Sequence, residues 1–292
     1  MSPTPDSHQS AAGPSHPGAP LSALLDLATV PRVTPPPNPL GGQVLVVDAA
    51  DPRAYAVPSA ALADAGPTDL IFLQPGLYED KVFVAARPIQ LVGAGRDLVY
   101  VVGRRAGPLY LQGVPSGRIE GITFRYVGSD QHSAVNVLDS TCTIARCRAM
   151  EAVLSGVLLY GPECRACLIE TEVCGNRESG IFVFGGASPR VADNLTWGNH
   201  HFGLAVRDAG GQAEFVRNES RDNWLSGMLL FGEAQAMLLE NRLVSNRQWG
   251  LVMTPECRTI PAGDELLQAN RVGDNPRGAL HVTEHPLADI GR

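Results

Sequence analysis

From residue 156 onward, a glycine precedes a short apolar run at a nearly constant interval. These glycines stand at positions 156, 180, 203, 227, 250 and 278, so the intervals are 24, 23, 24, 23 and 28 residues. Apolar residues follow each of the first five at the first and third positions, as in Val157 and Leu159. This alternation predicts a β-strand with one buried face. A fixed period near 23 residues predicts a solenoid in which equivalent side chains stack.

A second apolar column lies upstream of each glycine-led strand. Its members are Ile144, Leu168, Val191, Phe215, Leu238 and Leu267. Two positions further on stand Arg146, Glu170, Asp193, Arg217, Glu240 and Ala269. We therefore expect a second strand in each coil, with this mostly polar column on its outward face.

Between these two strands lies a pair of polar residues five positions apart. The pairs are Asn194 and Asn199, Asn218 and Asn223, Asn241 and Asn246, and Asn270 and Asn275, with Thr171 and Asn176 one period earlier. Asparagine tolerates the left-handed backbone of a sharp corner. Because parallel strands lie about 4.8 Å apart, stacked amides can hydrogen-bond from coil to coil. We expect a structural ladder made of Asn176, Asn199, Asn223 and Asn246.

The chain before residue 68 has a different character. Residues 1–40 contain ten prolines and too little apolar surface to offset the entropy of ordering, so we expect a disordered arm. Residues 41–67 are expected to form an N-terminal strand and a short helix at 59–65 with Ser59 as its N-cap. Such a helix covers the open end of a coil stack. Residues 68–292 are expected to form the coils.

The first coils add a recognisable signature. Pro75-Gly76 is followed by Tyr78 in the run 70–79, and a second apolar run occupies 89–93. Together with the asparagine and glycine period, this resembles the right-handed parallel β-helix repeat proteins, which include pectate-lyase-like enzymes and NosD-type periplasmic proteins. The resemblance implies an all-β, single-stranded right-handed parallel β-helix solenoid, here with a short capping helix and a disordered N-terminal arm. Leucine-rich repeats share the period but require a denser leucine framework than this chain has.

Composition narrows the classes of function. The net charge of the 292 residues is −7, so the basic footprint of a nucleic-acid-binding protein is absent. No apolar run reaches the about 18 residues of a membrane span, and no export signal is visible, so we expect a cytoplasmic protein without membrane contact. The six cysteines are then expected to be reduced core residues, the closely spaced Cys164 and Cys167 included, with no metal and no cofactor.

The outward positions of the glycine-led strands form the candidate functional surface. They are Leu158, Phe182, Ala205, Leu229, Val252 and Leu280 in one column, and Tyr160, Phe184, Arg207, Phe231 and Thr254 in the other. Such an apolar stripe is typical of an interface or a ligand platform. Three occupants stay open: the chain's own arm or tail, a protein partner or second copy in a homo-oligomer, and a glycan. Aromatic faces at Tyr160, Phe184 and Phe231 suit the rings of a glycan.

Carboxylates stand just past these strands, at Glu163, Asp208, Glu233 and Glu256. Asp208 and Glu233 come from neighbouring coils, which places them about 5 Å apart, near the spacing in retaining glycosidases. The alternative function is therefore a carbohydrate-active enzyme, a hydrolase, lyase or epimerase, with Asp208 and Glu233 as acid and base. We favour non-catalytic binding of a glycan or protein partner, because the sheet face is mostly apolar. The candidate ligand-binding residues are Tyr160, Phe182, Phe184, Arg207, Phe231 and Glu256.

Overall fold

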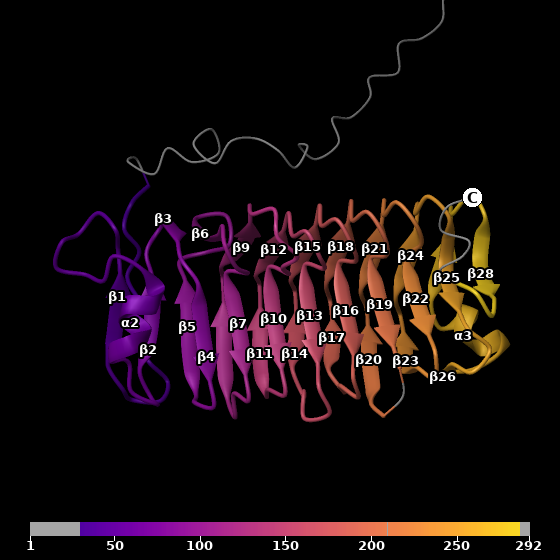
Figure 1. The fold of residues 1–292 in the computed structure, drawn as a ribbon, viewed down its shortest axis with the longest axis horizontal. Helices are drawn as coiled ribbons and strands as arrows, with labels where there is room; N and C mark the ends of the chain where they lie inside the picture. The colour runs from indigo at the N-terminus through magenta and orange to yellow at the C-terminus, as the bar shows by residue number, and fades with distance from the viewer. Residues whose placement is uncertain (1–29, 209, 287–292) are drawn as a thin grey trace, which may run out of the picture.

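The computed structural model describes residues 30–208 and 210–286. Each coil contributes one strand to each of three parallel sheets, named A, B and C here, and the coils stack along a single axis (Figure 1). The architecture is the predicted all-β, right-handed parallel β-helix. The predicted disorder of residues 1–29 lies outside the described residues.

Within the described chain the three sheets run the length of the stack. Sheet A contains β1 (Val44–Val47), β2 (Leu70–Leu73), β5 (Ile89–Gly93), β8 (Gly117–Glu120), β11 (Cys142–Ala145), β14 (Cys167–Ile169), β17 (Arg190–Ala192), β20 (Gln212–Val216), β23 (Gln235–Leu239) and β26 (Arg258–Ile260). Sheet B contains β3 (Gly76–Glu79), β6 (Val99–Gly103), β9 (Thr123–Tyr126), β12 (Arg148–Met150), β15 (Glu172–Cys174), β18 (Leu195–Trp197), β21 (Glu219–Arg221), β24 (Arg242–Val244) and β27 (Arg271–Gly273). Sheet C contains β4 (Val82–Ala85), β7 (Leu109–Gln112), β10 (Val135–Leu138), β13 (Val157–Tyr160), β16 (Ile181–Phe184), β19 (Leu204–Arg207), β22 (Met228–Phe231), β25 (Trp249–Met253) and β28 (Gly278–Val282). The glycine-led strands are those of sheet C.

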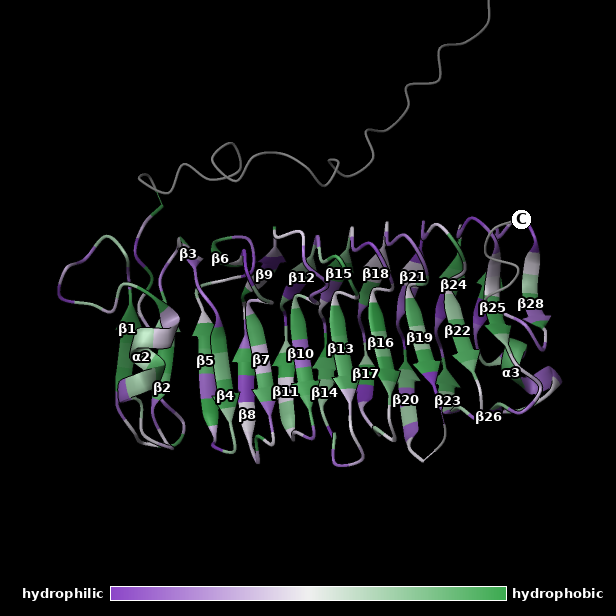
Figure 2. Ribbon diagram, in the orientation of Figure 1, coloured by the Kyte–Doolittle hydropathy of each residue, from purple (hydrophilic) through white to green (hydrophobic). Residues whose placement is uncertain are grey.

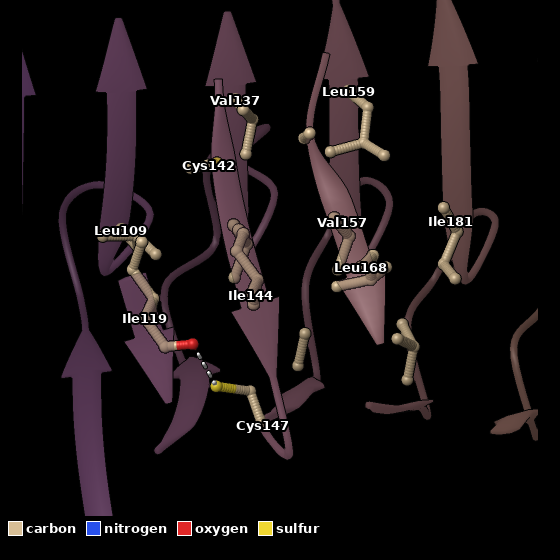
Figure 3. Packing of buried hydrophobic residues seen from close by; sticks show 14 of the residues in the cluster. Leu109, Ile119, Val137, Cys142, Ile144, Cys147, Val157, Leu159, Leu168 and Ile181 are labelled. Carbon is tan, nitrogen blue, oxygen red and sulfur yellow. Dashed lines mark hydrogen bonds between the residues drawn. The ribbon is translucent and has the colours of Figure 1, made fainter. Parts of the chain in front are cut away.

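The apolar columns of the sequence form the interior. Val157 pairs with Ile181, and Ile181 pairs with Leu204, so the first position after each glycine stacks inward. Figure 3 shows such side chains converging from facing sheets, with the Cys147 thiol 3.9 Å from the Ile119 carbonyl oxygen. Figure 2 shows green apolar stretches along the strands and many purple corners. Burial of one such side chain contributes about 1.5–3 kcal/mol, so each coil adds its own share of the core.

The corner from sheet A to sheet B differs from the prediction. Its residues Arg146, Glu170, Asp193, Arg217 and Glu240 have left-handed backbone, with φ between 49° and 57°. They form the turn and are not the outward face of a strand. Ala269 instead ends a helix, with φ of −76°. The left-handed residue is the exposed one that precedes each ladder position. The ladder asparagines were expected to adopt this conformation, but they do not have positive φ.

The predicted asparagine ladder is confirmed. Asn176 donates its amide to Oδ1 of Asn199 at 2.9 Å, Asn199 to Asn223 at 3.0 Å, and Asn223 to Asn246 at 2.9 Å. The other asparagine of each pair forms a second ladder at the A-to-B corner, through Asn194, Asn218, Asn241 and Asn270. Each Oδ1 also accepts a backbone N–H of the preceding coil, as Asn199 does from Asn176. These bonds fix the register between successive coils.

The N-terminal end of the stack is covered by helix α2 (Pro58–Asp64), as expected. Ala61 and Leu62 of this helix are buried in the core. Ser59 is not the N-cap, because the helix begins one residue earlier at Pro58 with Val57 in the cap position. The Asp80 carboxylate of the adjoining coil accepts the Ser59 N–H at 2.6 Å instead.

Residues 33–38, which the sequence placed in the disordered arm, lie along the outer face of sheet A. The Gln74 side chain accepts the Val33 N–H at 2.9 Å and donates to the Val33 carbonyl at 2.8 Å. Asn38 donates to the Thr68 carbonyl at 2.9 Å. Phe72 points outward between these anchor points and is nevertheless buried. This part of the predicted arm is therefore held to the first coils.

The last coil departs from the repeat. Helix α3 (Asp264–Gln268) follows β26 and buries Leu266, so the predicted strand position of Leu267 is wrong. The four extra residues of the 28-residue interval accommodate this helix. In β28, Leu280 pairs with inward Leu251 and packs against the core, so its predicted outward position is also wrong.

The described cysteines are free thiols, and four of the six are buried. Burial raises the pKa of Cys147 and of Cys174 to about 12, which keeps both protonated. Among the described residues no three His, Cys, Asp or Glu side chains are grouped so that they could hold a metal ion. No helix in the described ranges is long and apolar enough to cross a membrane.

Candidate functional site

The outer face of sheet C carries the predicted columns in register. Leu158 pairs with Phe182, Phe182 with Ala205, and Ala205 with Leu229. In the second column Tyr160 pairs with Phe184. The strands therefore present these side chains in rows parallel to the solenoid axis.

The aromatic rings in the first part of this face stack on one another. The Tyr160 and Phe184 rings are 5.1 Å apart with an interplanar angle of 1°, and Phe182 lies 5.3 Å from Phe184. The Tyr160 hydroxyl is 2.7 Å from the Tyr110 hydroxyl, and burial raises the pKa of Tyr160. One face of the Tyr160 ring and one face of the Phe184 ring are therefore occupied within the chain.

Arg207 leans back over these rings. Its guanidinium carbon lies 5.7 Å from the Phe182 centroid and 5.6 Å from the Phe184 centroid, a cation–π geometry. Its Nε is 3.2 Å from the Asp208 carboxylate. The side chain therefore points toward the preceding coil and leaves space on the side of Phe231.

The second part of the face is covered by side chains from the preceding corners. Ala205, Leu229 and Val252 point outward yet are buried, in a cluster with Phe202 and Leu225. Phe182, Phe231 and Trp249 pack against the edge of this cluster. The expected continuous exposed stripe is therefore wrong for this half of sheet C, because the sheet is shielded by its own corner residues.

A groove of about 360 Å³ lies where the two parts meet. Phe182 and Phe231 are among its walls, and Ala205 lies in register between Phe182 and Leu229. Since alanine is small, it leaves a gap in a column that is otherwise filled by large side chains. Phe202, Glu178, His201 and Arg207 also line the groove, so it combines an apolar floor with polar groups.

The acidic candidates lie elsewhere. Asp208 occupies a left-handed corner position with φ of 72° and donates its N–H to the Phe231 carbonyl, which places it beside Gly232. Glu233 is one position further along, so the two carboxylate residues are out of register. Asp208, Glu233, Glu256 and Glu163 are exposed, and none of them lines the groove.

A cationic and aromatic column lies at the B-to-C corner, where His200 precedes the groove residue His201. His200 stacks on Trp224 at 4.8 Å, and the Arg247 guanidinium lies 4.1 Å from the Trp224 centroid. Burial and the nearby charges of Arg177, His201 and Arg247 lower the pKa of His200. Trp224 is 47% exposed.

Sequence reasoning missed Glu178 and Phe202 as lining residues. The residue before the sheet C glycine is serine at 155, 179 and 226, but it is Phe202 or Trp249 in two coils. The large ring of Phe202, at a position where three other coils have serine, is the sequence signal that could have identified this lining residue.

The sequence matches the family model described as the right handed beta helix region over residues 109–283, more than half of the chain. The chain belongs to the right-handed β-helix family. No curated protein matched this β-helix protein by sequence.

Several solved structures resemble the β-helix protein, among them a glucanase, a pectate lyase and an alginate epimerase. A variant of the catalytic domain of a GH87 alpha-1,3-glucanase in complex with tetrasaccharides has 12% identity over 87% of this chain and 47% of its own, with a TM-score of 0.52. The pectate lyase Pel9A has 13% identity over 84% and 78%, with a TM-score of 0.49. The periplasmic alginate epimerase AlgG has 13% identity over 84% and 52%, with a TM-score of 0.41. The chain spans about half the length of the glucanase and epimerase chains, and the likeness concerns the fold alone.

Proposed function

We propose that this β-helix protein binds a carbohydrate, without transforming it, in the groove above Ala205. The observation that carries the proposal is the gap between Phe182 and Phe231, which interrupts an otherwise filled face. Its volume of about 360 Å³ falls at the small end of the range of ligand sites, and suits one or two rings of a chain rather than a protein surface.

The chemistry of the lining fits a sugar ring. The C–H faces of a pyranose are apolar and its rim carries hydroxyls, so it requires an apolar floor with polar groups at the sides. Ala205 and Leu229 supply the floor, while Glu178 and His201 supply hydrogen-bonding groups. A protein partner is the second candidate, since Phe182 and Phe231 are also suitable anchors for an aromatic side chain.

A glycan array followed by calorimetric titration tests the proposal. Phe231→Ala removes one wall, and we expect affinity for the bound glycan to fall at least tenfold, which corresponds to about 1.4 kcal/mol. Phe83→Ala is the matched control, because Phe83 is an aromatic residue on the outer face of the same sheet but outside the groove. Absence of glycan binding by the parent protein, or equal loss in both variants, would contradict the proposal.

The enzymatic alternative has one specific observation in its favour. Glu178 and His201 place a carboxyl and an imidazole in the same groove, and these groups serve as general acid and base in many enzymes. Product formation from the bound glycan that Glu178→Gln abolishes would establish this alternative. Product formation that requires Asp208 and Glu233 would instead restore the assignment made from the sequence.

A further inference from the structure

The outer face of sheet A carries an apolar stripe that the proposed ligand site does not use. Five successive strands, β11 to β23, place its side chains in register: Ala145, Ile169, Ala192, Val216 and Leu239. Ala192 and Val216 are buried within the chain, and the other three are half-buried.

Met237 and Ile260 lie in the neighbouring outward column, after Arg190 and Glu214, and Ile260 is 55% exposed. Residues 33–38 lie over β2, outside the stripe.

A row of charged corner residues runs beside this stripe. Its order along the stack is Arg146, Glu170, Asp193, Arg217 and Glu240. A second copy of the row can be placed opposite the first, running the other way, with Asp193 opposite Asp193. Arg146 of one row then faces Glu240 of the other, and Glu170 faces Arg217. The row is therefore complementary in charge to a reversed copy of itself at four of its five positions.

We propose that two copies of the chain associate face to face through sheet A, with antiparallel solenoid axes and a two-fold axis at the coil of Ala192 and Asp193. Such an interface is isologous, so each contact occurs twice. The same rotation sets small Ala145 against large Leu239, and Ile169 against Val216. Ala192 meets its own copy, which allows close approach of the two backbones at the axis.

The like charges at the axis are compensated within each chain. Arg217 donates to the Asp193 carboxylate through two bonds of 2.7 and 2.8 Å. Arg190, one column away, pairs with Glu214 at 2.9 Å. Each group that meets its own copy therefore brings an opposite charge with it.

The size of the face is at the low end for a dimer. Five coils at about 4.8 Å, with a strand and corner of about 20 Å, give a projected area on the order of 480 Å² per copy. Because side chains make the face uneven, its accessible area is larger than this projected area. A standard interface buries about 800 Å² per partner.

Light scattering coupled to gel filtration tests the proposal on the full chain. We expect a mass of twice 31.0 kDa at high micromolar concentration. Glu240→Arg and Arg146→Glu should each raise the dissociation constant at least tenfold, and the double variant should restore it, because the two side chains face each other across the two-fold axis. Met237→Lys should also weaken the dimer without touching an ion pair within the chain. Asp274→Arg, an exposed charge at a B-to-C corner, is the matched control.

Circular dichroism on each variant confirms that the fold is intact before the masses are compared. A chain that stays monomeric at every concentration would overturn the proposal. A dimer whose dissociation constant is unchanged by the sheet A substitutions would overturn it as well. So would a double variant whose dissociation constant does not return to that of the parent chain. Glycan binding is measured separately on the same samples, so failure of the dimer and failure of the ligand site are distinguishable.

Discussion

Asn199 is the residue on which the hydrogen bonds of three coils converge. Its Oδ1 accepts from the backbone N–H and the amide of Asn176, and its own amide donates to Asn223 and to the Val173 carbonyl. The side chain is fully buried, so water does not replace these partners. Buried polar groups without partners cost about 1–3 kcal/mol each.

Replacing Asn199 by alanine is therefore expected to lower the free energy of unfolding by about 3–5 kcal/mol. Urea denaturation followed by circular dichroism measures the change. His200→Ala is the control at the next position, which is exposed, and should cost less than about 1 kcal/mol. Equal losses of unfolding free energy in the two variants would mean that the ladder does not stabilise the alignment of the coils.

His200 also gives the fold a pH dependence with a definite sign. Partial desolvation of this surface imidazole and the nearby Arg177, His201 and Arg247 lower its pKa in the folded chain, so the unfolded chain takes up the proton first as pH falls. The stability contributed by neutral His200 is present above its ordinary pKa of about 6.5 and is lost as pH falls from that value through the lower pKa of the folded chain.

We expect urea midpoints measured from about pH 7.5 down to about pH 5.5 to decrease less in His200→Gln than in the parent chain. If both chains lose the same stability over this range, the imidazole is not the group responsible.

At the residue scale, the sequence predicted the stacking of the asparagines but not which corner residue adopts the left-handed backbone. The stacking of asparagines follows from their period, and it was predicted. The left-handed backbone falls instead on residues such as Arg217 and Glu240, which have poor intrinsic preference for it. The same backbone occurs at Arg146, which precedes Cys147, so the bend belongs to the corner itself and does not require an asparagine after it.

At the scale of elements, the strands of sheets A and C were predictable because one face of each is buried in every coil. The three-residue strands of sheet B that lie between the paired asparagines, such as β18, were not predicted, because the pairs indicate a corner there. The groove was not, since it depends on whether a corner side chain folds back over a strand. Phe202 and Leu225 do so and bury Ala205 and Leu229. Nothing in the alternation of a strand encodes a cover supplied by a neighbouring corner.

Helix α3 is an element that the repeat pattern did not predict. Leu266 is buried at the end of the core, where β26 is the last strand of sheet A in the described ranges. Leu266→Ala should cost about 2–4 kcal/mol, the usual range for an aliphatic side chain removed from a core.

Hydrogen exchange locates this effect. Protection should be lost first in β26, β27 and β28, because each coil contacts only its neighbours. Uniform loss of protection along the stack would show that the helix does not act as a local cap.

At the scale of the whole molecule, the solenoid presents separate long faces. Sheet C carries the groove with its aromatic walls, and sheet A carries the apolar stripe with its charged row. Because each coil contributes its own outward side chains to both faces, a single small residue such as Ala205 is sufficient to leave a groove. The family assignment accounts for the stack, and the individual positions on its faces account for the proposed binding.

A crystal structure of the chain with a glycan selected from the array tests the proposed binding most directly. The account predicts a sugar ring above Ala205, between Phe182 and Phe231, with hydroxyls bonded to Glu178 or His201. A ring seated at the corner beside Asp208 and Glu233, with the groove empty, would contradict it.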